Sequence, residues 1–487
     1  MKKTKNILKI NFKGGIVYVD QLRLIIDIIK NYNRIKIYLG NRQNLYLVLS
    51  NKYVDKILNS LNQSNIKYFT EVENNPNIVS SYVAIDLKGT TSWIKESIFN
   101  DVLDTFDYQP KLKINIIDIN QNLASPFDCD LCFVASNYHN FWYFLIKNPL
   151  QNKFYCWNKL IYSSDLGALA KEAEEYIIDK QDYDIENIQK YINEKFKYIF
   201  IEKHEELKFQ KASNNYDRIN PNGNNSWIEL FNFDSENSVN FFENILRECI
   251  KRKINKIYIT TWKTIIIKNI KEEDLINWKI IIGKHCFNLE HLSSEIYWKH
   301  EDFNTSAEKL KSYLIKELYK NGIKNSDLIY GICTNDDFNF TADISIKIKN
   351  PFPLLPFFKY YDIYYSENFN PVKENSVFIS REYLKSNLIN TIKYLSKKYY
   401  EDLEKLYHNN NQTNQNSKKV KHYWVPGKIY VCKDCNTVYD PEVGDIFNNI
   451  NPGTSFEELP DTYSCYICSS PKENFEIRLK TLERYEE

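Results

Sequence analysis

Four cysteines near the C-terminal end of the chain constrain its fold more than any other feature. They form two Cys-x2-Cys pairs with 29 residues between them: Cys432 and Cys435, then Cys465 and Cys468. Two such pairs can place four thiolates around one ion in tetrahedral geometry. A tight turn within each pair directs backbone N–H groups toward the sulfur atoms, which helps to set the redox potential of a metal. We therefore predict a metal site, and the spacing alone is compatible with zinc or iron.

The residues around the two pairs indicate which metal is bound. The segments YVCKDCNTVYDPEVGD and INPGTSFEELPDTYSCYIC, followed by Phe475, resemble rubredoxin over about residues 428–476. The resemblance implies a small three-stranded β fold with an aromatic core and one iron ion, held by four thiolates in its ferric and ferrous states. A structural zinc site is the alternative. The positions that carry the resemblance are Tyr430, Tyr439, Asp440, Pro441, Gly444, Asp445, Pro452, Gly453, Thr454, Phe456, Leu459 and Pro460.

The segment also departs from the rubredoxin pattern around its ligands. Rubredoxins usually have glycine after the second cysteine of each pair, where this chain has Asn436 and Ser469. Asparagine adopts the left-handed backbone conformation more readily than serine does. The usual proline after the third cysteine is Tyr466, and the usual aromatic residue before it, often tryptophan, is Tyr463. These changes affect the surroundings of the iron and leave the four ligands in place.

Charge is distributed unevenly along a chain whose net charge is +1. Between residues 430 and 476 nine acidic residues face only Lys433 and Lys472, which gives −7, so the rest of the chain carries +8. Such an asymmetry can guide docking between charged surfaces. The alternative interpretation is that two unrelated domains simply have solvated charged faces.

Several function classes are excluded by the rest of the sequence. The 12 glycines form neither G-x-G-x-x-G nor a P-loop, which argues against nucleotide-binding and flavin folds. No Glu-x-x-His motif occurs, which disfavours a di-iron helical bundle. No run of 18 apolar residues and no secretory leader are visible, so we expect a cytoplasmic protein without membrane contact. Nothing points to nucleic acid.

The long segment before the cysteine pairs contains an internal duplication. A helix pattern (19–32), the strand patterns RIKIYLG and NLYLVLS, and a second helix pattern (52–63) recur as a helix (239–251), KIYIT, TIIIKNI and a helix pattern from 272 to 284. Residues 40–47 (GNRQNLYL), 260–270 (TTWKTIIIKNI) and 283–298 make this body resemble the sulfite/nitrite reductase scaffold, which repeats a ferredoxin-like half.

The resemblance to the reductase scaffold points to candidate anion-binding residues, and it also reveals that the usual cysteine ligands of an iron–sulfur cluster are missing. In such reductases an Arg-Gln turn contacts the carboxylates of sirohaem, so Arg42 and Lys263 are candidate anion-binding or tetrapyrrole-binding residues. Active members also bind an iron–sulfur cluster through two closely spaced cysteine pairs. The six body cysteines lack that spacing, which disfavours sirohaem chemistry in this chain; they are Cys129, Cys132, Cys156, Cys249, Cys286 and Cys333.

These observations predict an α+β chain, with a duplicated ferredoxin-like, sulfite-reductase-like α/β body followed by a small rubredoxin-like iron-binding β domain. The predicted parts are residues 1–215 (first reductase-like half), 216–407 (second half), 408–424 (a flexible Asn-rich linker) and 425–487 (rubredoxin domain).

We expect the chain to be an electron carrier rather than an enzyme. Its mononuclear iron would pass one electron at a time between redox protein partners, a donor and a reductase in sulfite or nitrite assimilation. Two alternatives stay open: a sirohaem-type reductase that uses the rubredoxin as an internal donor, and a scaffold protein with a structural zinc site. We predict no catalytic residue, and the metal ligands are Cys432, Cys435, Cys465 and Cys468.

Overall fold

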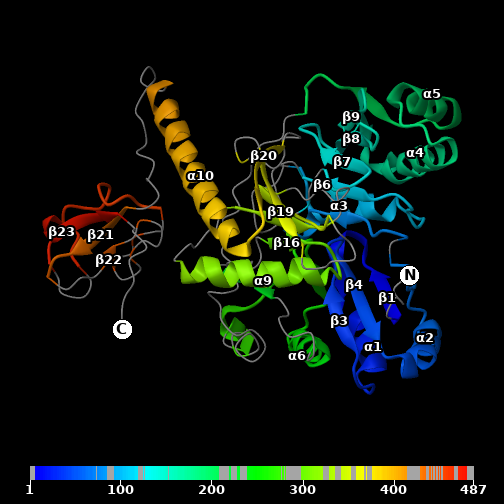
Figure 1. Cartoon of the computed structure of the whole chain (residues 1–487), viewed down its shortest axis with the longest axis horizontal. Helices are drawn as coiled ribbons and strands as arrows, with labels where there is room; N and C mark the ends of the chain where they lie inside the picture. Colours follow the sequence, from blue (N-terminus) through cyan, green and yellow to red (C-terminus); the bar gives the residue numbers. More distant parts are fainter. Residues whose placement is uncertain are drawn as a thin grey trace. The chain divides into compact units, whose positions relative to one another are not determined.

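The chain folds as two compact units, Met1–Tyr399 and Tyr400–Glu487. Their helices and strands are shown in Figure 1, which is drawn from a computed structural model. The structure describes residues 6–72, 74–84, 93–118, 124, 127–151, 153–207, 219–220, 227–230, 238–275, 277–278, 280, 298–321, 328–334, 342–351, 358–366, 369, 376–413, 428–434, 438–439, 441, 445, 448, 450, 453–465 and 470–479. None of the helices in this part of the chain has the length and apolar character needed to cross a bilayer.

The first copy of the repeat folds as an antiparallel three-stranded sheet with two helices, drawn in blue in Figure 1. Its order is β1-β4-β3. The alternating apolar residues of the strands and the apolar stripes of the helices produce the elements that the sequence predicted. They are β1 (Asn6–Asn11), α1 (Val19–Ile29), β3 (Lys36–Leu39), β4 (Asn44–Leu49) and α2 (Val54–Gln63).

The second copy forms a five-stranded sheet that also includes a strand from the first copy. Its order is β12-β13-β15-β14-β2, and β2 (Ile16–Tyr18) pairs antiparallel with β14. The predicted boundary between residues 215 and 216 therefore does not divide the body into two halves with separate sheets. The other elements are β12 (Ile219–Asn220), β13 (Trp227–Leu230), α6 (Ser238–Lys251), β14 (Lys256–Ile259) and β15 (Ile265–Lys268). Most of the predicted helix at 272–284 lies outside the described residues.

Two further sheets extend the duplication beyond what the sequence indicated. In both, three parallel strands are followed by two antiparallel ones: β5-β6-β7-β8-β10 and β16-β17-β18-β19-β20. A helix lies between the first and second strands of each set, and another follows the last. In the first sheet these elements are β5 (Val79–Ser80), α3 (Glu96–Asp104), β6 (Ile114–Ile117), β7 (Leu131–Ala135), β8 (Phe141–Asn148), β10 (Lys159–Tyr162) and α4 (Leu166–Lys180).

The second sheet has the matching elements in the same order. They are β16 (Trp298–His300), α9 (Thr305–Lys320), β17 (Tyr330–Cys333), β18 (Ile344–Lys349), β19 (Tyr360–Ser366), β20 (Ser376–Glu382) and α10 (Lys385–Thr413). The first sheet also carries extra edge elements, which are β9 (Lys153–Cys156), α5 (Ile185–Lys195) and β11 (Phe200–Glu202).

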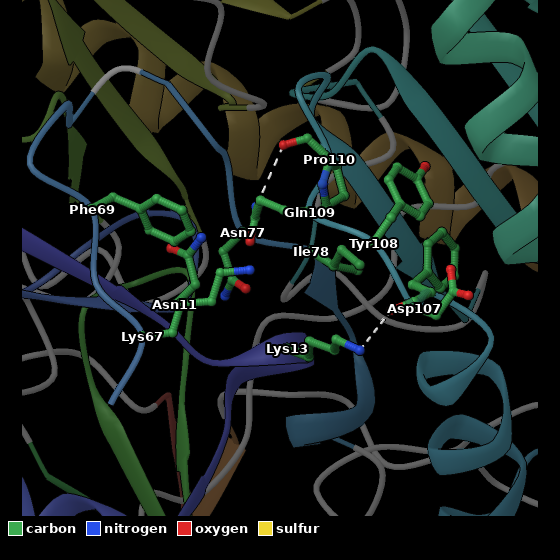
Figure 2. Close-up of a pocket in the computed structure, with 11 residues that line it drawn as sticks. Asn11, Lys13, Lys67, Phe69, Asn77, Ile78, Asp107, Tyr108, Gln109 and Pro110 are labelled. Carbon is green, nitrogen blue, oxygen red and sulfur yellow. Dashed lines mark hydrogen bonds between the residues drawn. The ribbon is translucent and has the colours of Figure 1, made fainter. Parts of the chain in front are cut away.

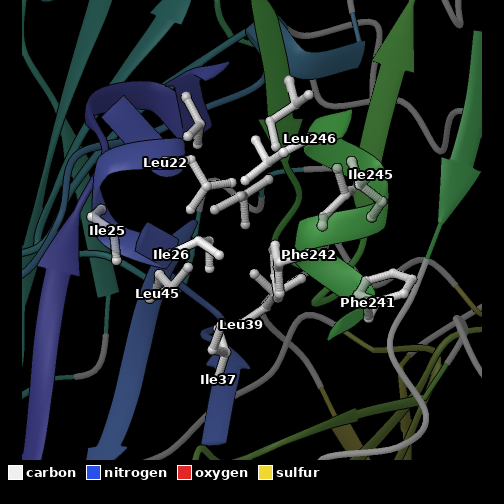
Figure 3. Close-up of a cluster of buried hydrophobic side chains, with 14 of the residues drawn as sticks. Leu22, Ile25, Ile26, Ile37, Leu39, Leu45, Phe241, Phe242, Ile245 and Leu246 are labelled. Atoms are coloured by element: carbon white, nitrogen blue, oxygen red, sulfur yellow. The ribbon is translucent and has the colours of Figure 1, made fainter. Parts of the chain in front are cut away.

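One apolar core joins the two copies of the repeat. Helix α1 from the first copy faces helix α6 from the second, so that Leu22 and Ile26 lie opposite Phe242 and Leu246 (Figure 3). All four side chains are buried. Neither copy can bury its apolar helix face alone, so the two copies form one folding unit.

The predicted flexible linker begins later than the sequence indicated. Helix α10 continues to Thr413, so residues 408–413, which we expected to be flexible, are helical. Residues 385–413 contain neither glycine nor proline, and an asparagine in a growing helix costs only about 0.5 kcal/mol relative to alanine. Residues 414–424 of the predicted linker lie outside the described residues.

The C-terminal unit ends in a small antiparallel sheet with the order β22-β21-β23. Its strands are β21 (Lys428–Cys432), β22 (Val438–Tyr439) and β23 (Phe475–Leu479). This agrees with the three-stranded β domain predicted for the segment, and the mixture of helices and sheets agrees with the predicted α+β class.

The shared core predicts that substitutions of two leucines in helix α1 have very different effects on stability. Leu22 is 1% exposed and Leu24 is 49% exposed. We expect Leu22→Ala to lower the free energy of unfolding of the body by about 2–5 kcal/mol, because it removes buried methyl groups and leaves a cavity. Leu24→Ala should change it by less than about 0.5 kcal/mol. Chemical denaturation followed by circular dichroism measures both, and equal losses would contradict a shared core at α1.

Candidate metal centre

Two of the four predicted ligands lie in the described part of the C-terminal unit, and both are buried. Cys432 is the last residue of β21, where it is in register with Phe475 of β23. Cys465 lies in the loop before the last strand, and the two residues are 0% and 1% exposed. Cys435 and Cys468 lie outside the described residues.

Backbone hydrogen bonds fasten both ligand loops to the segment 470–474. Lys433, directly after Cys432, donates its N–H to the carbonyl of Asn474 at 3.0 Å. Cys465 donates its N–H to the carbonyl of Ser470 at 2.8 Å. Loops that are far apart in the sequence are thereby brought to one short segment.

An aromatic core supports these loops. The rings of Tyr430 and Phe456 are stacked, with centroids 4.0 Å apart and an interplanar angle of 8°. The Tyr463 hydroxyl donates to the Asp445 carboxylate at 2.9 Å. Burial, reinforced by that hydrogen bond, raises the pKa of Tyr463 above its usual value. The core consists of Tyr430, Tyr439, Phe456, Leu459 and Tyr463, with Ile450 and Phe475 packed against it.

The donor chemistry of this unit fits a thiolate-bound ion. Two buried cysteines in loops fixed to the same segment are the described half of the predicted ligand set. Within the described residues no group of three or more His, Cys, Asp or Glu side chains is placed to bind a metal. The body therefore presents no rival metal site in that part of the chain.

The body contains two turns that match the internal duplication. In the β3–β4 turn, Gly40 and Asn44 are joined by an N–H to carbonyl hydrogen bond of 2.8 Å, and Gln43 has a left-handed backbone with φ 55°. In the β14–β15 turn, Thr260 and Thr264 are joined in the same way at 3.0 Å, and Lys263 has φ 64°. Gln43 and Lys263 thus occupy equivalent positions, which matches the predicted repeat at its most irregular point.

Arg42 lies in the first turn and is used inside the protein. Its guanidinium donates to the carbonyls of Asn77 (3.1 and 2.9 Å), Ile114 (3.0 Å) and Asp128 (3.3 Å), and to the side chain of Asn115 (3.1 Å). Burial lowers the pKa of this guanidinium. These contacts connect the hairpin to the sheet of β5–β10 and leave few donors for an external anion.

Lys263, the second predicted anion-binding residue, is paired within the chain. Its ammonium lies 2.9 Å from the Asp302 carboxylate, which also accepts hydrogen bonds from the Tyr46 hydroxyl (3.2 Å) and the Asn41 N–H (3.2 Å). The two predicted residues therefore bind different partners. Arg42 contacts the sheet that contains β5 and β6, and Lys263 contacts the segment after β16.

A cavity beside β1 is lined by a mixture of polar, charged, apolar and aromatic side chains (Figure 2). Its volume is about 260 Å³, and Lys13, Lys67 and Asn11 are part of its wall. The Lys13 ammonium donates to the carbonyl of Phe106 at 2.6 Å. Sites for drug-sized ligands usually have volumes of about 300–1,000 Å³. This cavity therefore does not fit a tetrapyrrole.

Comparison with known proteins identifies the C-terminal unit. Residues 429–475 match the family model for rubredoxin. The chain is 44% identical over 46 residues to rubredoxin-1 of Chlorobaculum tepidum (9% of this chain, 67% of the relative). It is 55% identical over 49 residues to probable rubredoxin-1 of Methanocaldococcus jannaschii (10% and 61%) and 49% identical over 47 residues to the high molecular weight rubredoxin of Moorella thermoacetica (10% and 20%).

These matches show that residues 429–475 are a rubredoxin domain, and through this domain the chain belongs to the rubredoxin family. A rubredoxin domain implies an iron ion bound by cysteines, and electron transfer is the chemistry that such a domain supports. The domain covers only about a tenth of the chain, and the chain spans less than two thirds of two of these three relatives.

The larger part of the chain is similar in fold to a solved structure. It resembles the NirA protein of Mycobacterium tuberculosis with a TM-score of 0.58 and 12% identity, over 79% of each chain. At this identity the likeness shows the fold alone. The body thus has the sulfite/nitrite reductase-like fold that the sequence indicated.

The residues predicted to contact sirohaem do not fit that group in their present contacts. The Arg42 guanidinium donates hydrogen bonds to backbone carbonyls, and the Lys263 ammonium forms an ion pair with Asp302. Both groups are therefore already engaged by partners within the protein.

Sequence reasoning missed the partners that decide the role of these cations. Asp302 and Asn77 belong to no recognisable sequence motif. Buried Lys9 was also missed; burial and the nearby Arg42 charge lower its pKa to about 8. Only contacts between distant segments reveal these environments.

The contacts of Arg42 predict a structural effect of its removal. We expect Arg42→Ala to lower the free energy of unfolding of the body by about 2–4 kcal/mol, because several buried carbonyls would lose their donor. Arg23→Ala is the control, since that side chain is 56% exposed and should cost at most about 0.5 kcal/mol. Chemical denaturation measures both variants, and an unchanged stability of Arg42→Ala would contradict a structural role.

Proposed function

We propose that this chain is a one-electron carrier whose iron is bound by the thiolates of Cys432, Cys435, Cys465 and Cys468. The observation that carries the proposal is the rubredoxin match over residues 429–475, a range that contains both cysteine pairs. An iron ion in such a site supplies a ferric/ferrous couple with the same thiolate ligands in both states. A reducing compartment such as the cytoplasm keeps the thiols available for the metal.

The chain's own residues serve this role by burial and rigidity. Cys432 and Cys465 are shielded from water, and a dry environment strengthens the electrostatic effect of nearby N–H groups on a thiolate. The stacked rings of Tyr430 and Phe456 hold the strand that ends in Cys432. A rigid surround changes little when an electron is gained or lost, which favours fast transfer.

We further propose that the carrier serves a reductase in sulfite or nitrite assimilation. Two observations support this direction: the body has a NirA-like fold, and the rubredoxin segment carries a net charge of −7 against a basic remainder of the chain. An acidic carrier is steered toward a basic partner surface. The donor and the acceptor would both be redox proteins.

A second candidate function makes the body itself a reductase fed by its own rubredoxin domain. The fold shared with NirA favours it. Two observations weigh against it. Arg42 and Lys263 are each bound to other groups of the protein, and the body cysteines lack the spacing of cluster ligands. We therefore propose the carrier first.

The metal and its redox behaviour test the carrier directly. We expect the purified full-length chain to contain one iron, to be red through thiolate-to-iron charge-transfer absorption, and to bleach with dithionite. Metal analysis and an absorption spectrum measure this. A colourless protein with one zinc ion per chain would contradict the proposal, whereas sirohaem bands with turnover of sulfite or nitrite would favour the second candidate.

The proposed ligands predict a local effect of a single substitution. Cys465→Ser should abolish iron retention, because a serine hydroxyl is a poor substitute for a thiolate, while the circular dichroism of the body stays unchanged. Cys156→Ser, which alters a partly exposed cysteine of the body, is the matched control and should keep its iron. Loss of iron from both variants, or from neither, would refute the assignment of Cys465.

A further inference from the structure

Asp434 lies between the two cysteines of the first pair, and its carboxylate contacts the other end of the domain. One of its oxygens, Oδ2, accepts a hydrogen bond from the Ser470 hydroxyl at 2.5 Å and another from the Asn474 side-chain amide at 2.5 Å. The two donors are 36 and 40 residues further along the chain. Asp434 thus connects the first ligand loop to the segment that follows the second.

The segment that Asp434 reaches is the one that already positions Cys465. Ser470 accepts the N–H of Cys465 through its carbonyl and donates to Asp434 through its hydroxyl. Ser470 is buried, with 8% exposure. A chain of two hydrogen bonds therefore runs from Asp434 through Ser470 to the backbone of a proposed ligand. Asn474 adds a parallel connection, since its carbonyl accepts the N–H of Lys433.

Side-chain contacts of this kind matter most when a metal leaves. Loss of an ion from a four-thiolate site requires the two ligand loops to separate, and contacts that tie the loops together oppose that separation. Hydrogen bonds to a carboxylate are stronger than neutral ones, although the exposed position of Asp434 limits their contribution.

We propose that Asp434 is a positioning residue that clamps the two ligand loops and slows release of the metal. The inference rests on the proposed function only in that Cys432, Cys435, Cys465 and Cys468 bind one ion. It does not require that the ion be iron, because the clamp acts on the loops and not on the metal.

The test measures metal release from the full-length chain in two forms. The iron form is followed by the loss of visible absorption in excess chelator, and the zinc-substituted form by the colour of 4-(2-pyridylazo)resorcinol. Loss of the clamp in Asp434→Ala should accelerate release about fivefold in both forms, which corresponds to about 1 kcal/mol, or about 0.5 kcal/mol for each of its two hydrogen bonds. Ser470→Ala should show a smaller acceleration, because Asn474 remains as a donor.

Two control variants separate the clamp from simple charge. Asp434→Asn keeps an acceptor oxygen without the charge and should release metal less than twofold faster than the unaltered chain. Asp461→Asn removes an exposed carboxylate elsewhere in the domain and should behave like the unaltered chain.

Equal release rates for Asp434→Ala and Asp461→Asn in both metal forms would overturn the clamp. If the unaltered chain retains zinc but never iron, the electron-carrier proposal fails, and the zinc form still tests the clamp. If the unaltered chain retains neither metal, both proposals fail. Far-UV circular dichroism of each variant checks that the domain remains folded.

Discussion

The packing of the body depends on how two equivalent hairpin turns pair their charged side chains. A charge that is wholly or partly removed from water needs internal partners, so each turn has acceptors from another segment of the body. The first turn uses carbonyls beside β5 and β6 for Arg42, and the second uses Asp302 after β16 for Lys263. The two hairpins of the repeat are thereby attached to the other parts of the body.

The same contacts explain why a reductase-like fold need not retain a reductase-like site. A cation that binds a carboxylate of a cofactor must be free to do so, and here both candidate cations are already paired within the protein. The shared core between α1 and α6 preserves the architecture independently of any ligand. Fold and chemistry are thus separable in this body, and the redox chemistry that the sequence supports resides in the C-terminal domain.

The degree to which the sequence predicted each part follows the range of the interactions involved. The helices and strands of the repeat were predictable because their apolar periodicity is local, and α1 begins at the predicted Val19. The predicted start of the linker at residue 408 was wrong, because the Asn-rich composition predicted flexibility where helix α10 continues to Thr413. The pairing of β2 with β14 was not predicted, because a three-residue strand has no periodic signal and its partner lies more than two hundred residues away.

By itself the sequence determined the rubredoxin domain, because a small metal domain is specified by its ligands and the turn residues around them, which are adjacent in the chain. It also determined the existence of a duplicated body through hydrophobic periodicity. Only the tertiary structure decided that Arg42 and Lys263 are paired internally and that Asp434 reaches Ser470 and Asn474. Those contacts join residues distant in sequence, and the free energy of a buried charge depends on which groups the fold brings beside it.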